Sequence, residues 1–241
     1  YRGLATVAAA SQPDMHASAL WRPAVSLLLA ARAPPPRLLS DAVDPFSTAG
    51  WPALQKELDA MPIWSVANEQ GQPLQYEIDG NPIALFYVDV EAAKKELAKS
   101  QGQFPELNCD LIPVGLGGAY KLSCEDKALI VPGTSELTAA GAPAGVPAMG
   151  QPLPLFACME MSRDSDTGPV LPLFVSYDDC KAAVDKATAA DAPEEPLEIV
   201  GLSLPSVVAK LSSVTEGSSA LGFAFVPPSA STAHILEYLG P

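Results

Sequence analysis

The chain has 241 residues, 25 of them proline, and a hydrophobic content of 48%, enough for one or two globular domains built from short elements. Its net charge of −14 disfavours binding to a nucleic-acid backbone. The absence of a CxxC pair disfavours a zinc site and thioredoxin-like chemistry. The four cysteines are Cys109, Cys124, Cys158 and Cys180, and the sequence leaves all three possible sets of disulfide pairings open. The favoured interpretation is that they are small, buried, free thiols.

Residues 1–50 are predicted to form an extended, partly helical and basic N-terminal arm. Residues 1–40 have a net charge of +3. The rest of the chain therefore has a net charge of −17, which gives the total of −14. The apolar run at 24–31 is too short to span a bilayer, which needs about 20 residues. It favours a short helix on a membrane surface or against a partner. Partner contacts are expected from Arg2, Trp21, Arg22, Leu27, Leu28, Leu29, Arg32 and Arg37.

A proline-rich linker at 33–45 separates this arm from the body. Such an arm is expected to be ordered only when a partner clamps it, because a free arm of this composition cannot offset its ordering entropy. We therefore predict that it packs on other subunits and not on its own domain. Tyr1, in place of a methionine, indicates a processed chain.

The first half of the body, about 51–125, begins with a helix that Pro52 starts and the Met61-Pro62 step ends. Two strands at 63–67 and 74–78 are predicted to form a hairpin. A buried strand at 83–88 then leads through the cap Asp89 into a helix at 91–99. Another strand is predicted at 111–116. The Gly-, Pro- and Ala-rich stretch at about 126–150 is interpreted as a linker.

The second half, about 151–241, repeats this order of elements. Strands are predicted at 155–161 and 170–175, with a turn at 163–168, then a helix at 177–190 capped by Ser176. A strand at 198–201, a helix capped by Ser203 and a last strand at 223–226 follow. The sequence therefore predicts an α/β (α+β) fold with an internal duplication. Residues 63–122 and 155–211 are each a strand–strand–helix–strand unit.

No motif of an enzyme stands out, and we expect neither catalysis, nor an intrinsic cofactor, nor a metal site. HExxH, GxSxG and P-loop patterns are absent. The glycines at 115–118 do not have dinucleotide-binding spacing and are interpreted as a loop. Asp178-Asp179 suits a helix N-terminus. His16 is at most a weak candidate for a chlorophyll ligand, and a solvent-facing or partner-bonded histidine is favoured. Chlorophyll or carotenoid contact is expected only through a partner complex.

Several short sequence motifs, taken in their order along the chain, resemble those of the Tic twenty-two family of plastids and cyanobacteria. They are LDAMPI at 58–63, NEQGQP at 68–73, IALFYVD at 83–89, IPVGLG at 112–117, AYKL at 119–122, VLPLFVS at 170–176 and LEIV at 197–200. The resemblance covers about residues 51–226, and residues 1–50 have no match in it. It implies a duplicated, butterfly-like α/β fold and a non-enzymatic, chaperone-like role in plastid protein import.

Two functions follow from the resemblance and the arm together. The first is a peripheral structural or assembly subunit of a plastid membrane supercomplex, with a photosystem and its antenna as the best guess and the thylakoid as the favoured location. The alternative is a soluble chaperone-like component of plastid protein import, in the intermembrane space. A cryptic enzyme ranks last. No nucleic acid or small-molecule substrate is expected.

Overall fold

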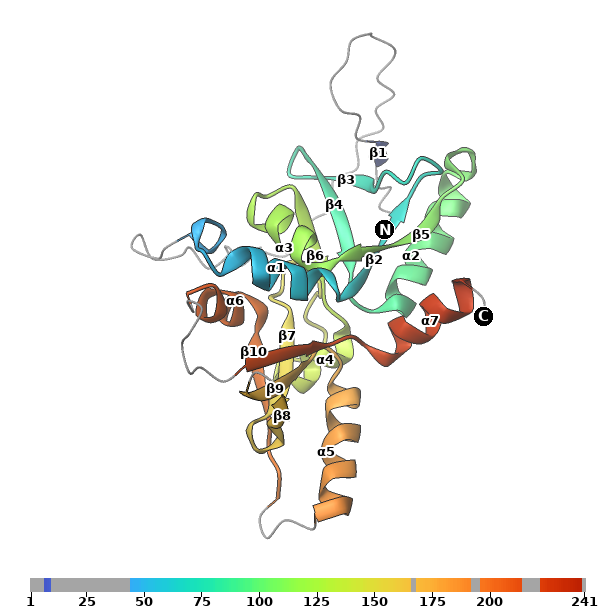
Figure 1. The fold of residues 1–241 in the computed structure, drawn as a ribbon. Helices are drawn as coiled ribbons and strands as arrows, with labels where there is room; N and C mark the ends of the chain where they lie inside the picture. The colour runs from blue at the N-terminus through green and yellow to red at the C-terminus, as the bar shows by residue number, and fades with distance from the viewer. Residues whose placement is uncertain (1–6, 10–43, 166–167, 192–195, 214–221, 240–241) are drawn as a thin grey trace.

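We describe the protein from a computed structural model, over residues 7–9, 44–165, 168–191, 196–213 and 222–239. This part of the chain forms two β-sheets, with helices at their junction and on their outer faces (Figure 1). The mixed α/β class predicted from the sequence is confirmed.

The first sheet follows the order β1-β3-β4-β2-β5, and β4 is its hub. β4 pairs antiparallel with β2 and β3, and parallel with β6. β3 pairs with residues 81–84 of β4 and β6 with residues 84–87, so the two ladders meet at Ala84. Its strands are β1 (Val7–Ala9), β2 (Pro62–Ala67), β3 (Leu74–Ile78), β4 (Asn81–Tyr87), β5 (Asp110–Gly115) and β6 (Ala128–Val131).

The second sheet follows the order β10-β7-β9-β11, and β9 is its hub. β9 pairs antiparallel with β7 and β8, and parallel with β11. β10 pairs antiparallel with the other side of β7 and is therefore an edge strand. Its strands are β7 (Pro154–Cys158), β8 (Arg163–Ser165), β9 (Gly168–Phe174), β10 (Ile199–Ser203) and β11 (Gly222–Val226).

The two sheets have one topology when β2 to β6 are matched, in order, with β7 to β11. In each, the first strand pairs with the third and fourth, the second forms a hairpin with the third, and the fifth runs parallel to the third. The match extends to single hydrogen bonds. The Leu116 N–H donates to the Met61 carbonyl at 3.0 Å, and the Leu204 N–H donates to the Leu153 carbonyl at 2.8 Å. The predicted duplication is confirmed and includes a fifth strand in each half.

Helices cover both sheets, and several begin at the caps that the sequence predicts. Asp89 Oδ1 accepts from the Glu91 N–H at 2.9 Å, and Ser176 Oγ accepts from the Asp179 N–H at 3.1 Å. The helices are α1 (Trp51–Asp59), α2 (Val90–Gln103), α3 (Leu116–Cys124), α4 (Thr134–Ala139), α5 (Tyr177–Asp191), α6 (Leu204–Ser212) and α7 (Ser229–Leu239). Short 3-10 turns lie at Pro45–Ser47, Pro105–Leu107 and Met159–Met161.

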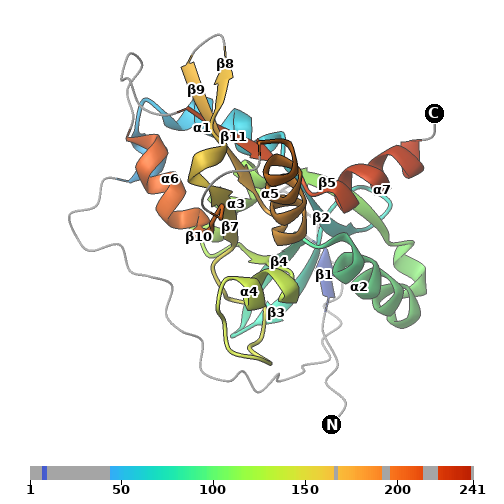
Figure 2. The same cartoon turned by 90° about the horizontal axis from the view of Figure 1, so that it is seen from below.

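The last helix of each half crosses to the other half. α7 follows β11 of the second sheet but packs beside α2, which covers the first sheet (Figures 1 and 2). α4 follows β6 of the first sheet but contacts α5, which covers the second. The two halves therefore complete one another and are not separate bodies.

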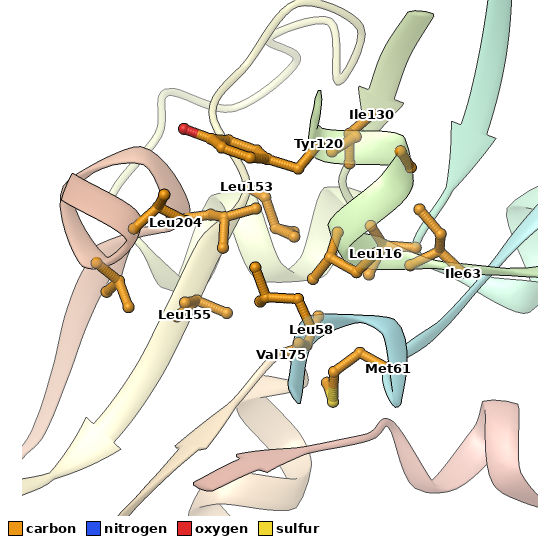
Figure 3. Close-up of a cluster of buried hydrophobic side chains, with 14 of the residues drawn as sticks. Leu58, Met61, Ile63, Leu116, Tyr120, Ile130, Leu153, Leu155, Val175 and Leu204 are labelled. Carbon is orange, nitrogen blue, oxygen red and sulfur yellow. The ribbon is translucent and has the colours of Figure 1, made fainter. Parts of the chain in front are cut away.

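One hydrophobic core joins the inner faces of the two sheets beneath α1, α3 and α6. Leu58 and Leu155 are fully buried there, although they come from different halves (Figure 3). Burying a side chain of this size stabilises the fold by about 1.5–3 kcal/mol. The same cluster holds Met61, Ile63, Phe86, Leu116, Ile130, Leu153, Leu173, Val175, Leu204 and Val208. Separate, smaller clusters lie on the outer faces, under α2 and under α5.

The predicted hairpin between 63–67 and 74–78 is wrong, because these strands pair with β4 and only the isolated bridge between Ala67 and Pro73 joins the two segments. The hairpin is instead β3–β4, where Ile78 pairs with Asn81 around Asp79-Gly80. Both turn residues have positive φ, 50° and 81°, as a type I′ turn requires. The Asp-Gly pair is the sequence signal for this turn.

The glycines at 115–118 do not form the predicted loop, since Gly117 and Gly118 lie in the first turn of α3. A Cβ at Gly117 would lie 2.8 Å from Asp59 Oδ1 and from the Gln55 carbonyl. The Gly118 N–H donates to Asp59 Oδ1 at 2.9 Å. The glycines therefore let α3 approach α1 closely. The segment 126–150, interpreted as a linker, contains β6 and α4.

Two described parts of the predicted arm contact their own domain, and the expectation that the arm packs on other subunits stays a prediction, because most of it lies outside the described residues. β1 extends the first sheet, with Val7 opposite Tyr76 and Ala9 opposite Leu74. Nearer the body, the Phe46 ring lies 4.7 Å from the Trp51 ring, edge to face.

Candidate functional site

Every arm residue predicted to touch a partner lies outside the described residues, as does His16. These residues are Arg2, Trp21, Arg22, Leu27, Leu28, Leu29, Arg32 and Arg37. The surfaces considered below therefore come from the body of the protein.

The four thiols are free, and three of them are buried as predicted. Cys124 is exposed, because it ends α3 on the outside of the core, so for this residue the prediction is wrong. Burial raises the pKa of Cys109 and Cys158, and raises that of Cys180 to about 11. These thiols are protonated at neutral pH and are therefore poor nucleophiles.

A small cavity of about 130 Å³ lies at the junction of the halves, where α2, α4, α5 and α7 begin. Its lining includes the caps Asp89 and Ser176 and the side chains of Glu136, Asp179 and Ser229. The Asp179 carboxylate accepts from the Ser229 N–H at 2.8 Å and from Ser229 Oγ at 2.6 Å. Asp179, predicted to serve a helix N-terminus, thus ties α5 to the start of α7. The bonds beside this cavity therefore hold the starts of α5 and α7 together.

The crossing helix α7, which the sequence analysis missed, docks on the outer face of the first sheet. Trp64 Nε1 donates to Ser231 Oγ at 3.0 Å, and both residues are buried. The His234 ring lies 4.9 Å from the Trp64 ring. At the far end of the helix, the Tyr238 hydroxyl donates to the Asp110 carboxylate of β5. The Pro227-Pro228 pair before Ser229 was the available signal, since prolines often precede a helix start.

The outer face of the second sheet is covered differently. Phe156 occupies the position that Trp64 has in the first sheet, since Trp64 pairs with Tyr87 and Phe156 with Phe174. The ring of Tyr177, from α5 of the same half, lies 5.2 Å from Phe156. The crossing helix on this side, α4, spans only Thr134–Ala139.

Most of the large apolar side chains that are exposed in the described residues lie on α7 or along the β7–β10 ladder. Leu236 and Tyr238 lie on α7, and Met159 and Leu202 lie at opposite ends of the β7–β10 ladder. Leu122 is the remaining one in the described residues. Exposed apolar side chains beside an edge strand are typical of surfaces that bind other polypeptides.

Within the described ranges, no cluster of three or more histidine, cysteine or acidic side chains is arranged to hold a metal ion. In the same ranges, no helix is both long and apolar enough to span a bilayer. The geometry thus defines an internally duplicated α/β protein whose accessible features are apolar side chains and strand edges.

Two solved structures share this architecture. "Tic22 from Plasmodium falciparum" superposes with a TM-score of 0.63 at 16% identity, over 77% of this chain and 97% of the other. "Anabaena Tic22 (protein transport)" superposes with a TM-score of 0.60 at 19% identity, over 79% of this chain and 98% of the other. No protein-family model and no curated protein matches the sequence. The chain has a Tic22-like fold, as the resemblance in its sequence implied.

Proposed function

We propose that this protein is a chaperone-like component of plastid protein import that acts by binding polypeptides without catalysing a reaction on them. The observation that supports the proposal is the Tic22-like fold, because one of the two similar structures is a protein-transport protein, "Anabaena Tic22 (protein transport)". Almost the whole of each similar chain is covered, 97% and 98%, so the likeness includes both halves of the fold.

Two features of the surface support binding of unfolded or extended chains. The first is the set of exposed apolar side chains on α7 and on the β7–β10 ladder. The second is the net charge of −14, which attracts cationic segments and repels other copies of the protein. Targeting segments for plastids are rich in arginine and serine and poor in acidic residues. An acidic binder therefore suits such clients.

A light-scattering assay tests the proposal. A chemically unfolded, aggregation-prone protein is diluted into buffer with and without the full chain. We expect suppression of aggregation at near-stoichiometric ratios, weakened by raised salt because part of the attraction is electrostatic. No suppression at any ratio contradicts the proposed function.

The expectation of a photosynthetic supercomplex subunit rested on the family resemblance, the lack of a membrane-spanning segment and the N-terminal arm, and no observation on the described residues favours it. Native purification separates the two functions. Crosslinking mainly to precursor proteins in transit supports the import role. Migration at fixed stoichiometry with one pigment-containing complex of the thylakoid fraction, which the rival hypothesis predicts, contradicts it.

A further inference from the structure

We propose that the free edge of β10 binds an extended, positively charged polypeptide segment by adding it as a strand to the second sheet. The inference rests on the proposed function and specifies where and how a client is held. Recognition of this kind uses main-chain hydrogen bonds, and therefore accepts many sequences.

The direction of the backbone groups of β10 follows from its ladder with β7. The Leu204 N–H, just after the strand, donates to the Leu153 carbonyl of the β7 segment at 2.8 Å. Successive N–H groups of a strand point to alternate sides. The N–H and C=O groups of Ile199 and Gly201 therefore face away from β7, whereas the C=O of Ser203 belongs to the first turn of α6, which Ser203 caps. No strand of the described residues pairs with that edge.

The equivalent edge in the first sheet is protected. Pro113 pairs with Trp64 in β5, and Gly201 pairs with Phe156 in β10, so the two positions correspond. By the same alternation, the nitrogen of Pro113 faces away from β2, because the Leu116 N–H donates toward that strand. Proline has no N–H to offer an added strand, and an edge proline is a common protection against unwanted pairing. In β10 this protection is missing.

Space and side chains around β10 suit an added strand. A Cβ at Gly201 would meet no atom within 4 Å, so the face of the sheet beside the middle of this edge is uncovered and leaves room for the side chains of an added strand. Met159 is 53% exposed and Leu202 is 36% exposed, which offers apolar contact at either end of the ladder. No lysine, proline or acidic residue lies in Ile199–Ser203 to discourage pairing.

Charge selects the occupant. Glu160 and Glu198 are both exposed beside the start of β10, next to the pair formed by Cys158 and Ile199. With the net charge of −14 they favour a cationic client over a second copy of the chain. The molecule also provides a precedent, since β1 adds to the β3 edge of the first sheet from far away in the sequence.

Fluorescence anisotropy with labelled peptides tests the proposal on the full chain. The probe is a peptide of about nine residues in which lysine alternates with valine, so that it can pair as one strand. One twin carries glutamate in place of lysine, and a second has alternate backbone nitrogens methylated. We expect both twins to bind at least about tenfold more weakly, because one loses charge attraction and the other loses main-chain donors.

The key variant is Gly201→Pro, which copies the proline of the equivalent strand, and its matched control is Gly201→Ala, which keeps the N–H. We expect Gly201→Pro to weaken binding of the lysine peptide at least about tenfold and Gly201→Ala to leave it nearly unchanged. If Gly201→Pro does not fold, Leu202→Lys decides, because an edge lysine discourages pairing and repels the probe. Circular dichroism verifies folding of each variant.

The proposal is overturned if folded Gly201→Pro, or Leu202→Lys in its place, binds the lysine peptide as tightly as the wild type does. It is also overturned if the methylated peptide binds the wild type as tightly as the lysine peptide does. A dimer of the wild type that Gly201→Pro dissolves also overturns it, because β10 would then pair between copies. These results are distinguishable from failure of the proposed function. A wild type that suppresses aggregation but whose β10 variants do so equally retains the function and loses only this site.

Discussion

The two halves of the protein share a backbone plan, yet they treat their outer faces and edges differently. In the first half, α7 lies over Trp64, and Tyr238 of that helix bonds to Asp110 at the start of β5. In the second half, the crossing helix α4 is short, and Phe156 is covered by Tyr177 of its own half. The edge strand β5 contains Pro113, where β10 has Gly201.

This difference shows how a duplicated fold can divide its tasks. The backbone plan is fixed by the shared core, since both halves contribute to it and neither can change without the other. Side chains on the outer faces are free of that constraint. In the first half, these side chains hold α7 over the outer face, and Pro113 protects the edge strand. In the second half, the edge of β10 is unprotected, and the proposed binding site lies on this edge.

The strongest test of the shared core is a matched pair of truncations. Phe86 precedes the residue that pairs with Trp64, and Leu173 precedes the residue that pairs with Phe156, so they are equivalent and both are buried. We expect Phe86→Ala to lower the free energy of unfolding by about 3–5 kcal/mol and Leu173→Ala by about 2–5 kcal/mol. Urea unfolding followed by far-UV circular dichroism measures this. Both variants should unfold in one transition, and two separate transitions contradict a shared core.

A second test uses Cys180, whose place in α2 is taken by Ala93. Each lies four residues after its helix cap, with its N–H donating to the cap carbonyl. Burial raises the pKa of Cys180 from 9.0 to about 11, so the folded state favours the protonated thiol. Stability from this group is complete below pH 9 and is lost as pH rises through 11. The loss is at most about 2.7 kcal/mol, which corresponds to two pKa units.

Urea unfolding at several pH values between 8 and 11 checks this prediction. Cys180→Ala copies the first half and should flatten the decline between pH 9 and 11. A decline of the same size in the variant assigns it to other groups and contradicts the prediction.

A third test breaks the docking of α7. In Ser231→Ala, the buried Trp64 N–H is left without its acceptor, which should cost about 1–3 kcal/mol. Hydrogen exchange should show faster opening of α7 than of α5. The double variant Trp64→Phe, Ser231→Ala should lose less stability than the sum of the two single variants, because phenylalanine has no N–H that needs an acceptor. The second half already has phenylalanine at the equivalent position, Phe156. Full additivity of the two substitutions argues against the bond.

The smallest effect is expected at the equivalent helix caps. Asp89→Ala and Ser176→Ala each remove one side-chain acceptor from an N-terminal N–H, of Glu91 and Asp179 respectively. Each should cost about 1 kcal/mol in thermal or urea unfolding. Asp89→Ser, which exchanges one cap for the other, should lose only a few tenths of that. A loss near zero for Asp89→Ala means that this cap does not stabilise α2.

The sequence by itself determined the elements whose causes are local. The caps Asp89, Ser176 and Ser203 were read correctly, because a side chain bonds the backbone only two or three residues away. The buried strands were found from short apolar runs, and the order of these elements showed the duplication. The similarity of motifs such as IALFYVD to the Tic twenty-two family also predicted the fold that the superpositions show.

Only the tertiary structure decided which elements meet. The pairing of β4 with β2 and the parallel addition of β6 each join residues whose contact no local pattern specifies. Gly117 and Gly118 lie where α3 packs closely against Asp59 of α1, and α7 bonds to Trp64, far away in the chain. An open edge is a property of the sheet, since β10 is exposed only because no described strand lies beyond it. Long-range packing assigns these roles, because its energy depends on neighbours that sequence distance does not reveal.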